Sequence, residues 1–420
     1  MSAPVAPPAH VGRPRAAAGA LALVLLSAGG LRLAHDYVSD PAMPRPHDFL
    51  QVWSAGRLNA DGQNPYDAER MYALQVANRM PDSRTPEHPD GYASMMWVPP
   101  WGLAVAMPLG VLPIDAAQLV WGLGQLALIA AAGVVIWQFY GGPAARWWVP
   151  VTLALGSGPV WWQTVGGQNG GLLLLGLTGF LVAHRANRPV LGGAFLALAA
   201  LKPHLLVLFA VGLLIDAARS GFGRRVVLGG ALALGGAAAV ATLFNPSVWG
   251  EYLAAATSGG SRYHPGLGDW FNPTVGAWVR HAVPGRPFWV QVVPCAAATL
   301  CFAVYWWRTG NPARWPAVLP WLVPVSLIVA PYGSWPSDQV LFLIPVVAVA
   351  ARLDARGIGL ASVGAAATAF AVANVAVVVM TGAQAPLHSY VWVAPVFAGC
   401  LLSAERAHRR GAPAAIPSGV

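Results

Sequence analysis

Charged residues are scarce in this sequence, and so are cysteine and lysine. Asp, Glu, Lys and Arg together make up 10% of the 420 residues, against 56% for hydrophobic residues. This composition excludes a soluble globular protein and is typical of a membrane protein that crosses the bilayer many times. Cys295, Cys301 and Cys400 all lie in apolar segments. They support neither a disulfide framework nor a cysteine-rich zinc site.

The net charge is +9, which by itself could indicate a nucleic-acid partner. The arginines, however, are spread over short turns between apolar segments instead of forming one basic stripe. That distribution follows the positive-inside rule for cytoplasmic loops. We therefore expect the bilayer, and no nucleic acid, as the surroundings of this chain.

Apolar segments of about the length of a membrane span, which is ~20 residues, recur along the chain. We predict an all-α, polytopic membrane protein in which residues 16–404 form one membrane domain. Residues 1–15 and 405–420 are then cytoplasmic tails, and residues 35–96 and 245–287 are extracytoplasmic loops. The twelve expected spans are 16–34, 115–139, 147–164, 169–184, 189–201, 203–217, 226–244, 287–307, 315–331, 336–352, 357–381 and 387–404.

Two parts of this topology have alternatives. The preferred arrangement makes residues 97–113 a re-entrant or interfacial element and divides residues 189–217 into two short helices that meet at Lys202-Pro203. The rival arrangement lets 97–113 span the membrane and treats 189–217 as one kinked helix, but it exports several arginines against the positive-inside rule. The first apolar segment could also be a cleaved signal peptide, although a retained span fits better.

Nine of the sixteen acidic residues fall within residues 35–96, directly after the first apolar segment. Asp48 is the candidate catalytic residue of this loop. A carboxylate that faces a wet cavity can act as a general base, removing a proton from a hydroxyl as it attacks. The alternative is structural, with Asp48 as a solvated loop acid or as the N-cap of a helix that begins at Phe49.

Lys202 is the only lysine, in a chain with 24 arginines. An ionisable side chain among apolar helices is a functional candidate, although a lysine that extends to the interface is the structural alternative. Lys202, His204, Arg262 and His264 are the candidate cations for an anionic leaving group.

Several polar residues are candidates for lining a substrate pocket. Residues 64–67 also form a turn followed by an N-cap for residues 68–79. The glycine-rich run 166–171 lacks the spacing of a phosphate-binding loop and indicates a tight hairpin instead. The pocket candidates are Asn64, Tyr66, Asp67, Gln168, Asn169, Tyr332 and Asp338.

The order of these short motifs along the chain is similar to that of a known protein family. Asp48-Phe49, the run from Gly62 to Asp67, Trp97-Val98-Pro99-Pro100, Gly167-Gln168-Asn169, Lys202-Pro203 and Ala330-Pro331-Tyr332 with Asp338 follow one another along the chain. In this order they resemble glycosyltransferase family 87, over roughly residues 48–345.

The resemblance implies a C-type glycosyltransferase fold in which a first extracytoplasmic loop carries interfacial helices and the catalytic aspartate, here Asp48. It implies a polyprenyl-phosphate sugar donor and an envelope glycolipid or glycan acceptor, with α-mannosyl transfer as the reaction. It places the protein in the cell membrane with its active site on the extracytoplasmic face.

The residues suit this chemistry independently of the family. A lipid phosphate is already a good leaving group, so the site needs a base and positive charge but no general acid. The sequence has no Asp-x-Asp pair and no nucleotide-binding strand-turn-helix, which argues against a nucleotide-sugar enzyme. We expect no metal and no cofactor. The competing functions are a lipid or solute transporter and a noncatalytic assembly protein.

Overall fold

The computed structural model describes residues 27–29, 32, 35, 45–84, 91–257, 271–355 and 364–410. Helices account for most of these residues, and none of them lies in a β-strand. The all-α prediction is therefore confirmed for this part of the chain. The α-helices are α2 His47–Ala60, α3 Ala68–Val76, α4 Leu103–Gly110, α5 Ile114–Phe139, α6 Trp148–Leu155, α7 Gly158–Gly166, α8 Gly170–Arg185, α9 Pro189–Ala199, α10 Val207–Arg219, α11 Gly221–Phe244, α12 Val248–Thr257, α13 Val275–Ala282, α14 Phe288–Thr309, α15 Trp315–Val329, α16 Leu343–Ala355, α17 Gly364–Gly382 and α18 Val393–Arg410.

Four helical segments of the described part are long and apolar enough to cross a membrane: Ile114–Phe139, Gly221–Phe244, Phe288–Thr309 and Pro312–Val329. Each coincides with an expected span. Large apolar side chains on α11 and α14, among them Leu243 and Trp289, face outward. A membrane protein is expected to present such a surface to lipid, and the membrane character of the chain rests on these helices.

Two expected segments, 189–217 and 147–164, are each divided into two helices in the structure. Residues 189–217 form two helices, α9 and α10, separated at Lys202-Pro203 by the short 3-10 helix Pro203–Leu206, as the preferred topology predicts. Residues 147–164 instead divide into α6 and α7 around Gly156 and Ser157. Pro159 explains this division, because proline lacks an N–H and clashes with the preceding helical turn.

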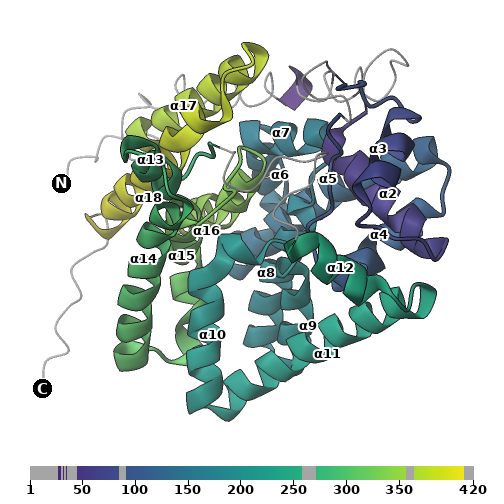
Figure 1. Cartoon of the computed structure of the whole chain (residues 1–420). Helices are drawn as coiled ribbons and strands as arrows, with labels where there is room; N and C mark the ends of the chain where they lie inside the picture. Colours follow the sequence, from purple (N-terminus) through teal and green to yellow (C-terminus); the bar gives the residue numbers. More distant parts are fainter. Residues whose placement is uncertain are drawn as a thin grey trace, which may run out of the picture.

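The ambiguous residues 97–113 contain the 3-10 helix Pro100–Gly102 and, directly after it, helix α4. Helix α4 has eight residues and is therefore about 12 Å long, much shorter than the ~30 Å hydrocarbon core. It packs closely on α2, because a Cβ added to Gly56 would lie 2.2 Å from the Ala106 carbonyl oxygen. A Cβ on Gly110 would lie 2.2 Å from the Arg57 nitrogen. Figure 1 shows α2, α3 and α4 as one group at the edge of the molecule.

The main hydrophobic core joins helices from both halves of the chain. Leu174, Phe180 and Phe209 pack with Trp315 and Phe342, and all five side chains are almost completely buried. This core fixes α8, α10 and α15 around the break between α9 and α10. The break therefore holds Lys202 in a rigid setting.

Candidate active site

Asp48 lies in the first turn of α2, and the N-cap position of that helix is Pro46. The structural alternative, in which Asp48 caps a helix beginning at Phe49, is therefore wrong, because the helix begins one residue before Asp48. The carboxylate instead lies beside the free N–H groups of the first turn, where the helix dipole favours negative charge. Asp48 is half-buried, so its carboxylate is not a freely solvated loop acid.

Gly167 brings the turn between α7 and α8 against the beginning of α2. It has φ +72, and a Cβ there would lie 2.6 Å from Phe49 Cβ and 2.8 Å from the Phe49 nitrogen. The Trp121 indole N–H donates to the Gly167 carbonyl oxygen at 2.7 Å. A Cβ on Gly166 would lie 3.6 Å from Asp48 Oδ2. The Asp48 carboxylate therefore faces this turn.

Replacing Gly167 by alanine is expected to damage the site through the backbone. A non-glycine residue in the left-handed region costs about 1–2 kcal/mol, and the new methyl group would also displace the first turn of α2. We expect a lower melting temperature in detergent together with a loss of activity. Gly124→Ala is the matched control, because nothing lies within 4 Å of a Cβ at that position. Equal behaviour of the two variants would contradict the importance of this contact.

Lys202 occupies the break between α9 and α10, with its side chain 16% exposed. Its ammonium donates one hydrogen bond to Gln168 Oε1 at 2.5 Å and a second to Asp338 Oδ1 at 2.5 Å. The Asp338 side chain is only 2% exposed, and its other oxygen accepts the backbone N–H of Trp335 at 3.0 Å. The buried Asp338 carboxylate is thus fully paired, as a buried charge must be.

Gln168 lies between Lys202 and Asp48. Its side-chain oxygen accepts from Lys202, and its side chain is near enough to the Asp48 carboxyl to lower the pKa of that group. The amide of a glutamine carries its acceptor and its donors on separate atoms, so the Gln168 nitrogen remains available to donate to the Asp48 carboxylate. Asp48, Gln168, Lys202 and Asp338 therefore form one polar cluster, called the Asp48 network below, from four separate segments of the chain.

Burial is the largest influence on Asp48 and raises the pKa of its carboxyl above the ordinary 3.8. The charge of Lys202 and the hydrogen bond from Gln168 act in the opposite direction without cancelling the rise. A carboxylate with a raised pKa is a stronger base at neutral pH. Burial, followed by the charges of Asp338 and Asp48, raises the pKa of Tyr332 to about 12. Tyr332 therefore keeps its phenolic proton and is a neutral hydrogen-bond donor near both carboxylates.

His204 and Tyr332 flank this network. Their ring centroids are 5.8 Å apart, and the Trp335 ring meets Tyr332 edge-on at 5.9 Å. The loop that carries Tyr332 turns at Gly333, φ +79, and Ser334, φ 55. A Cβ on Gly333 would lie 2.8 Å from His204 Nε2, so the glycine permits this close approach of the loop to His204.

The turn at residues 64–67 lies elsewhere. Asn64 Oδ1 accepts the Tyr66 N–H at 2.8 Å, and the Tyr66 hydroxyl donates to the Val98 carbonyl oxygen at 2.9 Å. Asp67 is the N-cap of α3, which confirms the structural prediction for this residue. Asp48 is in the first turn of α2, a 14-residue helix about 21 Å long, and this turn follows the other end of that helix. The pocket role of Asn64, Tyr66 and Asp67 stays a prediction.

Arg262 and His264 lie outside the described residues. Asn169 follows Gln168, and its side-chain oxygen is buried without a hydrogen-bond partner among the described residues. Gln163 was not predicted as a site residue; its side-chain oxygen and nitrogen are also buried without a hydrogen-bond partner among the described residues. A glutamine directly after the apolar Trp161-Trp162 pair was the signal for it. These buried amides provide unused polar groups next to the turn that contacts Asp48.

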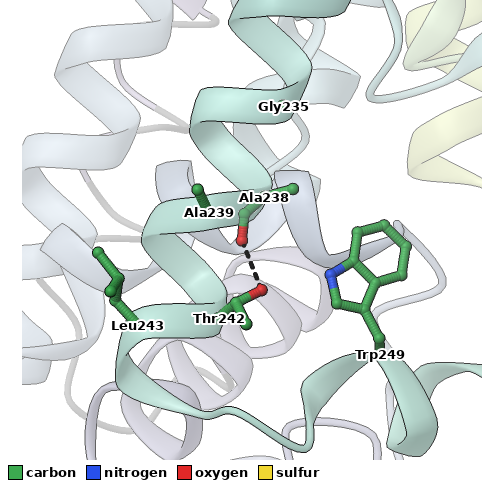
Figure 2. A pocket seen from close by; sticks show the side chains of 6 residues that line it. All are labelled: Gly235, Ala238, Ala239, Thr242, Leu243 and Trp249. Carbon is green, nitrogen blue, oxygen red and sulfur yellow. Dashed lines mark hydrogen bonds between the residues drawn. The ribbon is translucent and has the colours of Figure 1, made fainter.

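An open apolar hollow of about 470 Å³ lies at the C-terminal half of α11 and the start of α12. Figure 2 shows Leu243, Thr242 and the two alanines of α11 on one side of it and Trp249 on the other. The Trp249 ring is 6.3 Å from Trp101, whose indole N–H donates to the Ala200 carbonyl oxygen at 3.4 Å. Two tryptophans thus connect this hollow to the residues directly before Lys202.

The described residues contain no group of three or more His, Cys, Asp or Glu side chains that could hold a metal ion. Among the described residues, Lys202 is the cation of the Asp48 network.

The family model described as Glycosyltransferase family 87 matches residues 98–331, more than half of this chain. The matched range contains Gln168, Lys202 and His204, and Asp48 and Asp338 lie on either side of it. No curated protein and no solved structure matches the chain.

Proposed function

This chain belongs to glycosyltransferase family 87, and on that premise we propose that it transfers a mannosyl or related residue from a polyprenyl-phosphate donor to an envelope glycolipid or glycan. The observation that carries the proposal is that Asp48 lies beside Gln168 and Lys202, which are hydrogen-bonded to each other and both lower the pKa of its carboxyl. A base and a cation joined in one network are the two groups that such a transfer needs.

Asp48 is the general base of the proposed reaction. The acceptor hydroxyl oxygen attacks the anomeric carbon of the donor while its proton moves to the Asp48 carboxylate. The bond between the anomeric carbon and the phosphate oxygen breaks, and its electron pair leaves with polyprenyl phosphate. A single displacement inverts the anomeric centre, so a β-linked mannosyl phosphate gives an α-mannoside.

Lys202 is the first candidate for holding the donor phosphate. An ammonium has three N–H donors, and Gln168 and Asp338 accept two of them. The third N–H remains for a phosphate oxygen, and its charge stabilises the negative charge that develops as the donor bond breaks. We further propose His204, Arg262 and His264 as phosphate contacts. Gln168, Asn169, Tyr332 and Asp338 then shape the pocket, together with the residue 64–67 turn.

The hollow of Figure 2 supports a lipid donor. It is lined by apolar side chains of α11, a helix apolar enough to cross the membrane. The contacts from Trp249 through Trp101 to Ala200 lead from it towards Lys202. An isoprenoid chain lying there would have its phosphate end near the Lys202 ammonium.

We also propose the C-type fold, about twelve spans in one membrane domain, and an extracytoplasmic site in the cell membrane. The helices that coincide with expected apolar segments support this topology. The arginines of the short turns follow the positive-inside rule when Asp48 faces outward.

The test is to incubate the purified protein with polyprenyl-phosphate mannose and a panel of glycolipid acceptors. We expect a mannosylated lipid by mass spectrometry. The family match does not support the alternative of a transporter. Movement of the lipid-linked sugar across a proteoliposome membrane, without any product from the full acceptor panel, would reject the enzyme in favour of the transporter.

The rate of transfer is expected to fall as the pH falls through the pKa of Asp48, because a protonated carboxyl cannot accept the hydroxyl proton. The midpoint of this acid limb should lie above 3.8, the ordinary value that burial raises. Asp338→Asn should move the midpoint to lower pH, because the charge of Asp338 raises the pKa of Asp48. The measurement is kcat against pH for both proteins. An acid limb that stays at the same pH in the variant would contradict this coupling.

A further inference from the structure

A second open groove, of about 660 Å³, lies where α9 begins beside the first turns of α11. Pro189, Val190, Leu191 and Ala194 form its apolar wall, with Arg188 and Arg225 also lining it. Neither the Asp48 network nor the hollow of Figure 2 shares any of these residues. The groove is therefore separate from both sites described above.

Beside the groove, glycines allow the backbones of α9 and α11 to approach each other closely. A Cβ on Gly193 of α9 would lie 1.8 Å from the Val226 carbonyl oxygen, and a Cβ on Gly229 of α11 would lie 2.0 Å from the Val190 carbonyl oxygen. Both additions are sterically impossible without movement of the backbone. The crossing is consequently fixed, and so is the placement of the groove wall relative to Arg225.

The two arginines differ from most of their counterparts in other turns. Several arginines are occupied by protein partners: Arg146 by Asp354, Arg352 by Glu405, Arg185 by the Phe139 carbonyl, Arg219 by the Trp306 carbonyl and Arg314 by the Thr309 carbonyl. Arg188 and Arg225 are exposed. In the described ranges they have no ion pair or side-chain hydrogen bond, and no acidic residue lines their groove.

This combination favours one class of ligand. A guanidinium binds a phosphate group through paired, charge-assisted hydrogen bonds, so two unpaired arginines favour an anion. The exposed side chains of Val190 and Leu191, however, offer nothing to a small hydrated anion. They do suit a hydrocarbon chain, and α11 is apolar enough to lie in the bilayer. A ligand with a phosphate at one end and a hydrocarbon chain at the other satisfies both halves of the groove.

We propose that this groove binds an anionic phospholipid of the bilayer, with its phosphate between Arg188 and Arg225 and an acyl chain along Val190, Leu191 and Ala194. Basic pockets between membrane helices recognise anionic headgroups in this manner. The proposal is independent of the transfer reaction. Since α9 ends three residues before Lys202, the bound lipid would also anchor the helix that positions that lysine.

The test is native mass spectrometry of the full-length protein after reconstitution into nanodiscs of phosphatidylcholine with a minority of phosphatidylglycerol. We expect the wild type to retain phosphatidylglycerol selectively on release from the disc. Arg188→Gln/Arg225→Gln should lower the retained amount about tenfold or more, because both charge-assisted contacts are lost. Ala194→Trp, which fills the groove and leaves both arginines in place, should lower it too.

Arg308→Gln is the control for the loss of an exposed arginine outside the groove. Arg308 is an exposed arginine in the last turn of α14, and its loss changes the net charge by one without touching the groove. Undiminished phosphatidylglycerol in the double variant, or in Ala194→Trp when that variant melts like the wild type, would overturn the proposal. So would equal retention of phosphatidylcholine by the wild type. Displacement of the lipid by excess inorganic phosphate would assign the groove to a soluble anion and overturn it as well.

Discussion

Asp48→Asn is expected to lower kcat for sugar transfer by about 10²–10⁴-fold, the range typical of losing a general base. Asparagine has nearly the same shape as aspartate and keeps an oxygen that can accept from Gln168. It cannot take up the acceptor proton. The loss should therefore appear in kcat with little change in donor binding, and the melting temperature should stay close to that of the wild type.

Asp61→Asn is the matched control for this experiment. Asp61 directly follows α2, and its exposed carboxylate pairs with Arg57 at 2.9 Å. An exposed pair of this kind contributes little to stability, and Asp61 is at the far end of α2 from the site. We expect full activity in Asp61→Asn. If Asp48→Asn turned over as fast as Asp61→Asn, the carboxylate of Asp48 would not be the base.

Lys202→Met is expected to affect both folding and activity. It leaves the Asp338 carboxylate buried without its cation, and breaking a buried ion pair by removing one partner costs about 3–5 kcal/mol. It also removes the only ammonium of the site, for which we expect a loss of about 10²-fold or more in kcat/KM, comparable to losing one electrostatic donor to a transition state. Thermal unfolding and transfer kinetics measure the two effects separately.

A double variant separates these two roles of Lys202. Lys202→Met/Asp338→Leu removes both charges, so it should recover most of the stability that the single variant loses. It should not recover transfer, because nothing replaces the N–H that faces the donor phosphate. Recovery of activity along with stability would show that Lys202 acts only through folding. Lys202→Arg, which retains the charge, should keep more activity than Lys202→Met.

The local features of the fold follow from the sequence. Apolar stretches predicted the positions of α5, α11, α14 and α15. The sequence Asn64-Pro65-Tyr66-Asp67 predicted the turn and the N-cap of α3, because the interactions involved span only a few residues. The helix break at Lys202-Pro203 was predictable for the same reason, since proline acts on its immediate neighbours.

The contacts that assemble the site are not local. Lys202 and Asp338 are separated by 136 positions in the chain, and no periodicity indicates that they pair. The glycine-rich run at 166–171 indicated a hairpin, but a single sequence does not reveal that Phe49 packs against Gly167. The position of Asp48 inside the first turn was also missed, because Pro46 starts the helix without a capping side chain. Tertiary packing determined each of these features.

The anomeric configuration of the product shows whether a single displacement, with Asp48 as base and polyprenyl phosphate as leaving group, joins the sugar to its acceptor. Given a β-linked polyprenyl-phosphate mannose and a glycolipid acceptor, the purified wild-type protein should form an α-mannoside, which the one-bond C–H coupling at the anomeric carbon identifies by NMR. A β-mannoside product would require a second displacement and would contradict the account.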